Sequence, residues 1–176
     1  MLALPLIAMA ILLVACGGGS STTATSPEGS GGGGSPPGGN AGGGRCGELL
    51  TQDEVAAAFG GDVGAPVEHA AGGGGLSGVA CQWLREGTLA ADVSVFSGPS
   101  ATVARSQLDQ DKGTAAGEDV AGVGDAAFFS QFTGVLEATQ GSTLVKVAVG
   151  APQGQTDFSG LLPKDKQLMA LVLGRA

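Results

Sequence analysis

Few side chains in this sequence offer acid–base or nucleophilic chemistry. His69 is the only histidine, so a Ser-His-Asp hydrolase would have to use it. It stands in a segment flanked by Pro and Gly, where we expect a solvated loop histidine and not a catalytic base. Two carboxylate pairs, Asp109 with Asp111 and Glu118 with Asp119, would suit glycoside hydrolysis only at a suitable spatial separation. We interpret them as a solvated helix end and a solvated turn.

Three glycine-rich stretches resemble nucleotide or nucleophile motifs without completing them. Residues 122–127 fit G-x-G-x-x-A, but a dinucleotide site needs that motif between a strand and a helix, and here a strand-like Phe128-Phe129 follows. We interpret this stretch as a turn in which Asp125 caps backbone amides. Residues 72–75 lack the Lys and Ser/Thr of a P-loop and indicate a flexible connection. Residues 75–79 are one residue short of Gly-x-Ser-x-Gly.

Of the three cysteines, Cys46 and Cys81 form an even pair once Cys16 is set aside. In an exported chain the expected state of such a pair is one disulfide, which would stabilise the fold by roughly 3–4 kcal/mol. No Cys-x-x-Cys is present, and a zinc site would need more ligands than these two cysteines and His69 provide. Trp83, the only tryptophan, would either stack on a ligand or pack in the core beside the disulfide, and we expect packing.

Cys16 calls for a different chemistry. Residues 2–15, "LALPLIAMAILLVA", form an apolar run that is too short for a bilayer span and suits the h-region of a signal peptide. The sequence Leu-Val-Ala-Cys that ends this run resembles a bacterial lipobox, in which the cysteine receives a diacylglycerol and becomes the mature N-terminus. A signal peptide normally starts with a basic residue, yet none precedes Arg45. Either the true start lies upstream, or the amino terminus alone supplies the charge.

The composition after Cys16 divides the chain. Residues 17–44 are mostly Gly, Ser, Thr and Pro and cannot build a core. They predict a tether with a root-mean-square reach on the order of 30 Å. We therefore expect a signal peptide over 1–15, a lipidated cysteine and tether over 16–44, and a single domain over 45–176.

The charge of the chain excludes one class of function. The formal net charge is −8, and the basic residues are scattered along the sequence. Nucleic-acid binding needs a basic footprint, so we expect no nucleic-acid partner. The acidity favours solubility, and no cluster of residues indicates a cofactor or a metal.

The folded part shows clear periodic segments. Thr51 and Glu54 form a capping box before an apolar helix face, and Gly60 marks its end. Residues 79–84 and 88–97 predict a hairpin, with Cys81 and Trp83 on one face of the first strand and Leu89, Ala91, Val93 and Val95 directed inward from the second.

The second half of the domain predicts a helix, a meander and a further helix. A helix over 101–112 precedes a polar turn. A loop over 120–132 then leads into the first of three strands, with the other two over 135–140 and 143–150. An amphipathic helix ends the chain. The fold class expected is α+β: an antiparallel sheet of about five strands, hairpin plus three-strand meander, with three helices packed on it.

The order of these motifs resembles a known family. The lipobox Cys16, the tether, Cys46, "LLTQDEVAAAFG", "VACQWL" and "VAGVGDAAFF" are similar to small actinobacterial lipoproteins grouped as domain of unknown function 3558. That family has no established activity. The resemblance implies an envelope location and the bridge between Cys46 and Cys81, and no catalytic residue.

These observations favour one function over two alternatives. We expect an exported lipoprotein on the outer face of the cell membrane, anchored through Cys16 and acting as a non-enzymatic binding or interaction module for an envelope protein. The first alternative is a pocket between sheet and helices for a small apolar or lipidic ligand, beside Trp83. The second is a cell-wall hydrolase, which would need His69.

Overall fold

The computed structural model describes residues 44–151 and 155–176. They form an α+β fold around one antiparallel sheet, as expected, but with seven strands and four α-helices in the described residues where the sequence predicted about five strands and three helices. In chain order the elements are α1 (Arg45–Leu49), α2 (Gln52–Phe59), β1 (Val67–Gly73), β2 (Leu76–Arg85), β3 (Thr88–Ser97), α3 (Ala101–Ala115), β4 (Glu118–Asp119), β5 (Ala126–Ser130), β6 (Val135–Gln140), β7 (Thr143–Val149), the 3₁₀ turn η1 (Ser159–Leu161) and α4 (Leu162–Leu173).

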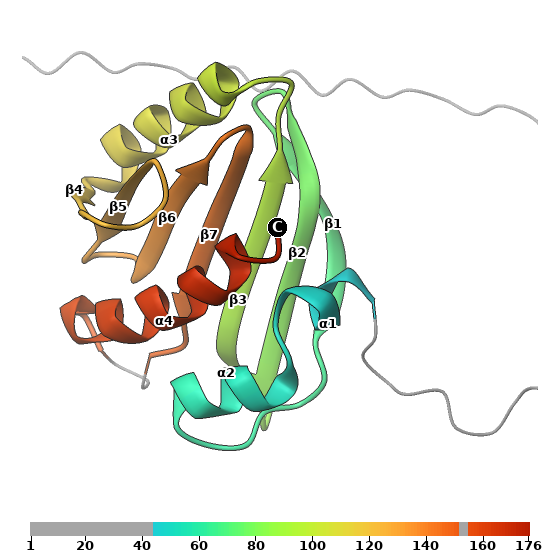
Figure 1. The fold of residues 1–176 in the computed structure, drawn as a ribbon. Coiled ribbons are helices and arrows are strands. Elements are labelled where there is room, and N and C mark those ends of the chain that lie inside the picture. Colours follow the sequence, from blue (N-terminus) through green and yellow to red (C-terminus); the bar gives the residue numbers. More distant parts are fainter. Residues whose placement is uncertain (1–43, 152–154) are drawn as a thin grey trace, which may run out of the picture. The chain divides into compact units, whose positions relative to one another are not determined.

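The sheet order is β1-β2-β3-β7-β6-β5-β4, and every neighbouring pair is antiparallel (Figure 1). The predicted hairpin is β2–β3 and the predicted meander is β5–β6–β7. The additional strands, β1 and β4, lie at the two edges of the sheet. The additional helix is α1, which contains Cys46.

The helices divide between the two faces of the sheet. One face carries the main core, where α1, α2 and α4 pack on a layer of buried side chains that includes Cys81, Trp83 and Val147. The opposite face carries α3, which contacts β5, β6 and β7 over a smaller apolar cluster: Leu76, Leu108, Phe128 and Leu144. Figure 1 shows α3 lying over the β4–β5–β6 side of the sheet, away from β1.

The local chemistry explains the first long helix. Thr51 and Glu54 form both halves of the predicted capping box at the start of α2. Gly60 ends α2 at a φ of +92°, a left-handed conformation that glycine adopts without strain. Leu50 and Val55, on either side of the cap, are both fully buried.

Two predicted details of the sheet are wrong. Gly72 and Gly73 belong to strand β1, although residues 72–75 were expected to be a flexible connection; Gly74 and Gly75 form the turn to β2. Leu89 was expected to point inward, yet it is 38% exposed, whereas Ala91, Val93 and Val95 are buried as predicted. The pairing of β2 with β3 shifts by one residue between Trp83 and Leu84. This irregularity breaks the alternation of inward and outward side chains in β3, so Leu89 no longer points inward with Ala91.

Candidate functional site

The candidate site is a row of polar side chains on the face of the sheet that carries α3. The strand register places Ala80 of β2, Ser94 of β3, Lys146 of β7 and Glu137 of β6 side by side in that order. Their chain neighbours point to the other face, where Val145 and its equivalents fill the main core. The same alternation that builds the core therefore brings a lysine and a glutamate together on the opposite face.

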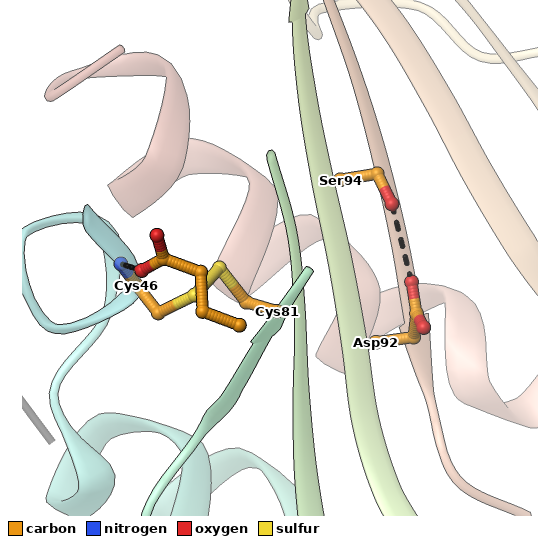
Figure 2. Close-up of a disulfide and its surroundings, with 5 residues drawn as sticks. Cys46, Cys81, Asp92 and Ser94 are labelled. Carbon is orange, nitrogen blue, oxygen red and sulfur yellow. Dashed lines mark hydrogen bonds between the residues drawn. A yellow bond between two sulfur atoms is a disulfide. The ribbon is translucent and has the colours of Figure 1, made fainter. Parts of the chain in front are cut away.

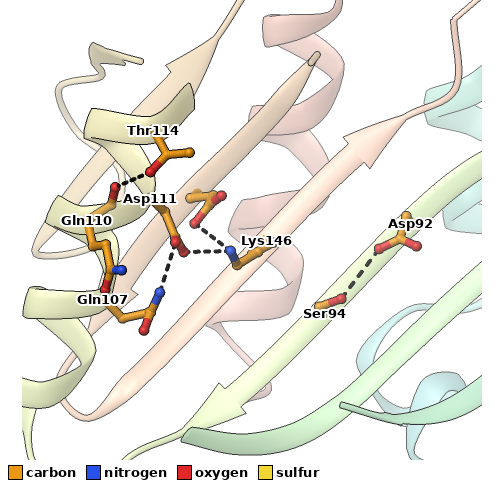
Figure 3. A network of polar contacts seen from close by, with 8 residues as sticks. Asp92, Ser94, Gln107, Gln110, Asp111, Thr114 and Lys146 are labelled. Atoms are coloured by element: carbon orange, nitrogen blue, oxygen red, sulfur yellow. Dashed lines mark hydrogen bonds and ion pairs between the residues drawn. The ribbon is translucent and has the colours of Figure 1, made fainter. Parts of the chain in front are cut away.

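Helix α3 adds a second carboxylate above this row. Asp111 Oδ2 lies 2.7 Å from the Lys146 ammonium, and Glu137 Oε2 lies 3.1 Å from it. Gln107, one turn earlier on α3, donates a hydrogen bond of 2.8 Å to the other oxygen of Asp111. Figure 3 shows Gln107 and Asp111 reaching down from the helix toward Lys146 on its strand. We call Gln107, Asp111, Glu137 and Lys146 the polar cluster.

Burial controls the protonation of this cluster. Glu137 is only 6% exposed. Burial, with a smaller contribution from the neighbouring Asp111, raises the pKa of Glu137 to about 7 in spite of the opposing effect of Lys146. Burial is the largest single influence on Asp111 and on Lys146 as well, but the hydrogen bonds and charges of their neighbours together outweigh it, so the pKa of Asp111 is lowered and that of Lys146 is raised.

A second set of polar contacts lies next to the cluster, on β2 and β3. Gln82 of β2 donates a hydrogen bond of 2.9 Å to Asp92 of β3, and the Ser94 hydroxyl lies 3.4 Å from the other oxygen of Asp92. Figure 3 shows Asp92 and Ser94 on the strand beside Lys146. Together with the polar cluster, these residues form a continuous row of polar side chains from β2 to β6, in which Ser94 and Glu137 are buried.

The chemistry available to this arrangement is proton exchange near neutral pH and attraction of positive charge. Two carboxyl groups share one ammonium, so the cluster carries more acidic than basic groups. A carboxyl group with a pKa of about 7 is half protonated in neutral solution. Among the described residues, no group of three His, Cys, Asp or Glu side chains is arranged to hold a metal ion.

The structure contains the disulfide between Cys46 and Cys81. Their Cα atoms lie 5.6 Å apart, and both residues are buried. The bond joins the short helix α1 to β2, on the face opposite the polar cluster (Figure 2). The Cys46 amide also donates a hydrogen bond of 3.2 Å to Glu68 of β1, so α1 is held to both strands of the edge hairpin.

Trp83 and His69 lie in different environments. The Trp83 side chain is fully buried in the main core, two residues along β2 from the disulfide. His69 is exposed on β1, so it is a strand residue and not the loop residue that the sequence predicted. Its register partner across β2 is Ala80, and among the described residues it makes no side-chain hydrogen bond to a serine or a carboxylate.

The carboxylate pairs that the sequence predicted as solvated differ in their exposure. Asp109 is an exposed partner of Arg105 on α3, as expected for a solvated helix. Asp111 is half-buried in the polar cluster, so its assignment to a solvated helix end is wrong. Asp119 is exposed as expected, but it and Glu118 form the short strand β4 instead of a turn. The Asp119 carboxylate forms an ion pair with Lys112.

Asp125 caps a backbone amide as predicted. Its carboxylate, just before β5, accepts a hydrogen bond of 2.7 Å from the N–H of Gly141 in the turn between β6 and β7. The motif that includes it leads into strand β5, which excludes the strand-to-helix geometry of a dinucleotide loop.

Sequence analysis missed Glu137 and Lys146. The available signal was a charged residue inside each of two otherwise apolar strands, at positions that alternate with buried valines. Such a residue ordinarily faces solvent. Only the register between β6 and β7, together with α3 on that face, shows that the two residues lie opposite each other and are partly covered.

The predicted lipidation site, Cys16, lies outside the described residues, as do the predicted signal peptide and most of the predicted tether. No helix in the described part of the chain has the length and apolar character needed to cross a bilayer. No family model matches the chain, and no curated protein matches it. The resemblance to actinobacterial lipoproteins therefore stays a prediction.

Proposed function

We propose that this chain is an exported bacterial lipoprotein, anchored to the outer face of the cell membrane through Cys16, whose folded part is a non-enzymatic binding module. The observation that carries the anchor is Leu-Val-Ala-Cys at the end of an uncharged apolar run, followed by a tract without core-forming residues. The disulfide between Cys46 and Cys81 supports export, because such bonds persist in oxidising compartments.

The anchor is tested by the intact mass of the protein purified from membranes. The expected chain begins at Cys16 and carries a diacylglycerol on its thiol. Ser20→Ala, a change just beyond the processing site, serves as the control. This variant should be processed and lipidated as the wild type is, and its mass should differ only by the lost oxygen. A protein that retains residues 1–15, or one that carries an unmodified Cys16, contradicts the proposal.

A group of exposed apolar side chains supports a partner-binding role. Leu84 and Leu89 are cross-strand partners at one end of the β2–β3 hairpin, and they are 37% and 38% exposed. Val67 of β1, the register partner of Gln82, lies diagonally from Leu84 and is 44% exposed. Clustered exposed apolar residues of this kind mark interaction surfaces more often than scattered ones do. We call these three residues the apolar patch.

The partner is tested by cross-linking in cells. Leu84→Glu is expected to abolish a specific cross-linked species, because it places a charge at the centre of the apolar patch. Phe132→Glu is the matched control, since Phe132 is the most exposed large apolar residue of the described chain at 74% and lies outside the patch. Equal cross-linking by both variants contradicts a role for the patch.

One observation favours the alternative of a small ligand. A cavity of about 540 Å³ lies at the end of the sheet that carries the β2–β3 turn, where Phe59, Leu89 and Leu161 supply apolar walls; Trp83, beside which the pocket was expected, does not line it. Arg85 and Lys164 add two cations and Glu86 adds one carboxylate, so basic groups outnumber acidic ones and the ligand that suits this cavity is an apolar molecule with an acidic group. The test is binding of a fatty acid to the purified chain. Arg85→Gln and Lys164→Gln are expected to weaken it, and unchanged binding in both variants excludes this cavity as the site.

A further inference from the structure

The polar cluster opens into a small cavity that the proposed function does not use. The cavity measures about 200 Å³ and is bounded by α3, by the sheet and by the glycine turn 72–74 at the tip of the β1–β2 hairpin. Gln107, Asp111 and Lys146 contribute its polar wall. A Cβ on Gly74 would meet the end of the Gln107 side chain, so the turn and the helix lie close together here. The Gly74 φ of +61° favours glycine.

The remaining walls of the cavity are apolar. Leu76, Phe96 and Leu144 line the side formed by the sheet. A volume of about 200 Å³ corresponds to roughly six or seven water molecules at about 30 Å³ each, which is room for a short hydrocarbon chain with one polar end. The cavity therefore combines a charged end and an apolar side within one small volume.

The charges select the sign of the ligand. Asp111 and Glu137 together have one cationic partner, Lys146. The nearest other basic residue on that turn of α3, Lys112, is paired with Asp119, at 2.6 Å. Glu137 Oε2 is buried and, among the described residues, accepts no hydrogen bond of good geometry. Glu137 pairs with Lys146 but is not part of the cavity wall, where Asp111 and Lys146 are the charged groups. An anion in the cavity would compete with Asp111 for Lys146, whereas a cation on Asp111 would leave Lys146 to an ionised Glu137, so that two carboxylates face two cations.

We propose that this cavity binds a primary alkylammonium group, with the ammonium on Asp111 and the alkyl chain against Leu76, Phe96 and Leu144. This site goes beyond the proposed envelope function and does not depend on lipidation of Cys16. An alkylammonium fits better than a bare cation for two reasons. The apolar walls give a metal ion no ligands, and the described residues offer no group of three metal-binding side chains.

Binding of the ammonium is coupled to release of a proton. The groups that face Glu137 are Lys146 from β7, Asp111 from α3 and the uncharged Phe128 from β5. When a ligand cation occupies Asp111, Lys146 is free to pair with Glu137 alone, which favours the ionised carboxylate. Affinity should then rise with pH by up to about tenfold per unit through the region in which free Glu137 titrates, and level off above it.

The test is calorimetric titration of the full chain, purified in detergent, with n-butylamine. We expect saturable binding of butylammonium, little or no binding of 1-butanol, and a heat at pH 7 that differs between two buffers of unlike ionisation enthalpy. Asp111→Asn should weaken binding at least about tenfold, which is the effect of losing one charge-assisted contact of about 1.4 kcal/mol or more. Asp109→Asn, on the same helix but exposed and paired with Arg105, is the matched control and should bind as the wild type does.

Glu137→Gln tests whether the pH dependence of butylammonium binding comes from the titration of Glu137. This variant should still bind butylammonium, with an affinity that no longer changes with pH between 6 and 8. The comparison of butylamine with butanol uses only the wild-type chain, so it decides the question even if a variant folds poorly. Equal binding of the two compounds, undiminished binding by a folded Asp111→Asn variant, or absence of saturable binding at millimolar butylamine overturns the proposal.

Discussion

Replacing Asp165 by asparagine should reverse the sign of its effect on stability between pH 5 and pH 8. Asp165 lies in the first turn of α4 and is fully buried. Its Oδ1 accepts a hydrogen bond of 2.8 Å from the Val149 amide at the end of β7, while its Oδ2 has no hydrogen-bond partner among the described residues. Burial raises the pKa of Asp165 from 3.8 to about 7, although the Val149 hydrogen bond and the charge of Lys164 oppose the shift.

The size of the effect follows from the linkage between protonation and folding. The unfolded chain releases this proton near pH 3.8 and the folded chain near pH 7, so the folded state loses stability as pH rises between those values and loses no more above them. Each pKa unit corresponds to 1.36 kcal/mol, which gives about 4 kcal/mol over the whole range. The part that falls between pH 5 and pH 8 is about 3 kcal/mol.

Asp165→Asn keeps an oxygen that can accept from the Val149 amide but cannot ionise. At pH 5 the variant should be less stable than the wild type by about 1 kcal/mol, because its amide N–H groups are buried without an acceptor. At pH 8 it should be more stable by about 2 kcal/mol, because the wild type then carries a buried charge. The free energy of unfolding of the variant relative to the wild type should therefore rise by about 3 kcal/mol across this range.

Urea denaturation at pH 5, 6, 7 and 8 measures this difference, and the fluorescence of Trp83, the only tryptophan and fully buried, reports unfolding. Glu137 also has a raised pKa, so the stability of the wild type alone mixes two titrations. Subtracting the two proteins at each pH removes the contribution of Glu137. A difference between variant and wild type that stays constant from pH 5 to pH 8 would refute the reasoning.

Three further predictions test other parts of the fold. Replacing Cys46 and Cys81 by alanine, which opens a loop with a sequence separation of 35, should lower the free energy of unfolding by about 4 kcal/mol in urea titrations; a loss below about 1 kcal/mol would contradict the structural role of the bond. Gly78→Ala should destabilise by about 1–3 kcal/mol, since its Cβ would collide with a β3 carbonyl oxygen, and an unchanged melting temperature would disprove that close approach. Arg175→Met should return the pKa of Glu54 from about 2 toward 4.5 in an NMR titration, because the Arg175 hydrogen bond is the largest cause of its depression. In the wild type, the lowered pKa means that Glu54 contributes stability above pH 4.5 that is lost as pH falls toward 2. An unshifted Glu54 titration in the variant would argue against the pairing with Arg175.

The parts of the fold that the sequence predicted are those with local causes. The capping box of Thr51 and Glu54 and the left-handed Gly60 determine both ends of α2 with little help from the rest of the chain. Strands β3, β6 and β7 follow from alternating apolar residues between turn residues, and their observed bounds differ from the predicted ones by at most one residue.

Strand β1 could not be predicted because nothing local specifies it. Residues 67–73 are mostly exposed, contain two alanines and two glycines, and show no alternation of apolar and polar side chains. Glycine in a strand is unfavourable on its own, so the strand depends on pairing with β2 along its full length. Strand β4, at the other edge, consists of only two residues and depends in the same way on β5.

The polar cluster was beyond sequence analysis for a related reason. Asp111, Glu137 and Lys146 come from three elements, and neither their spacing nor their types mark them as neighbours. Their proximity requires the β6–β7 register, which pairs Glu137 with Lys146, and the position of α3 on that face. The pKa of about 7 for Glu137 depends on burial, which only the packing of α3 supplies.

The register of the sheet links the core to the polar cluster. The buried row that contains Cys81, Val93 and Val147 is one residue along each strand from the row that contains Ser94 and Lys146. A slip of one residue would exchange the two faces, placing a lysine in the main core and valines beneath α3. The disulfide lies in the first of these rows and joins β2 to α1, so it fixes the face of β2 that is turned toward the main core.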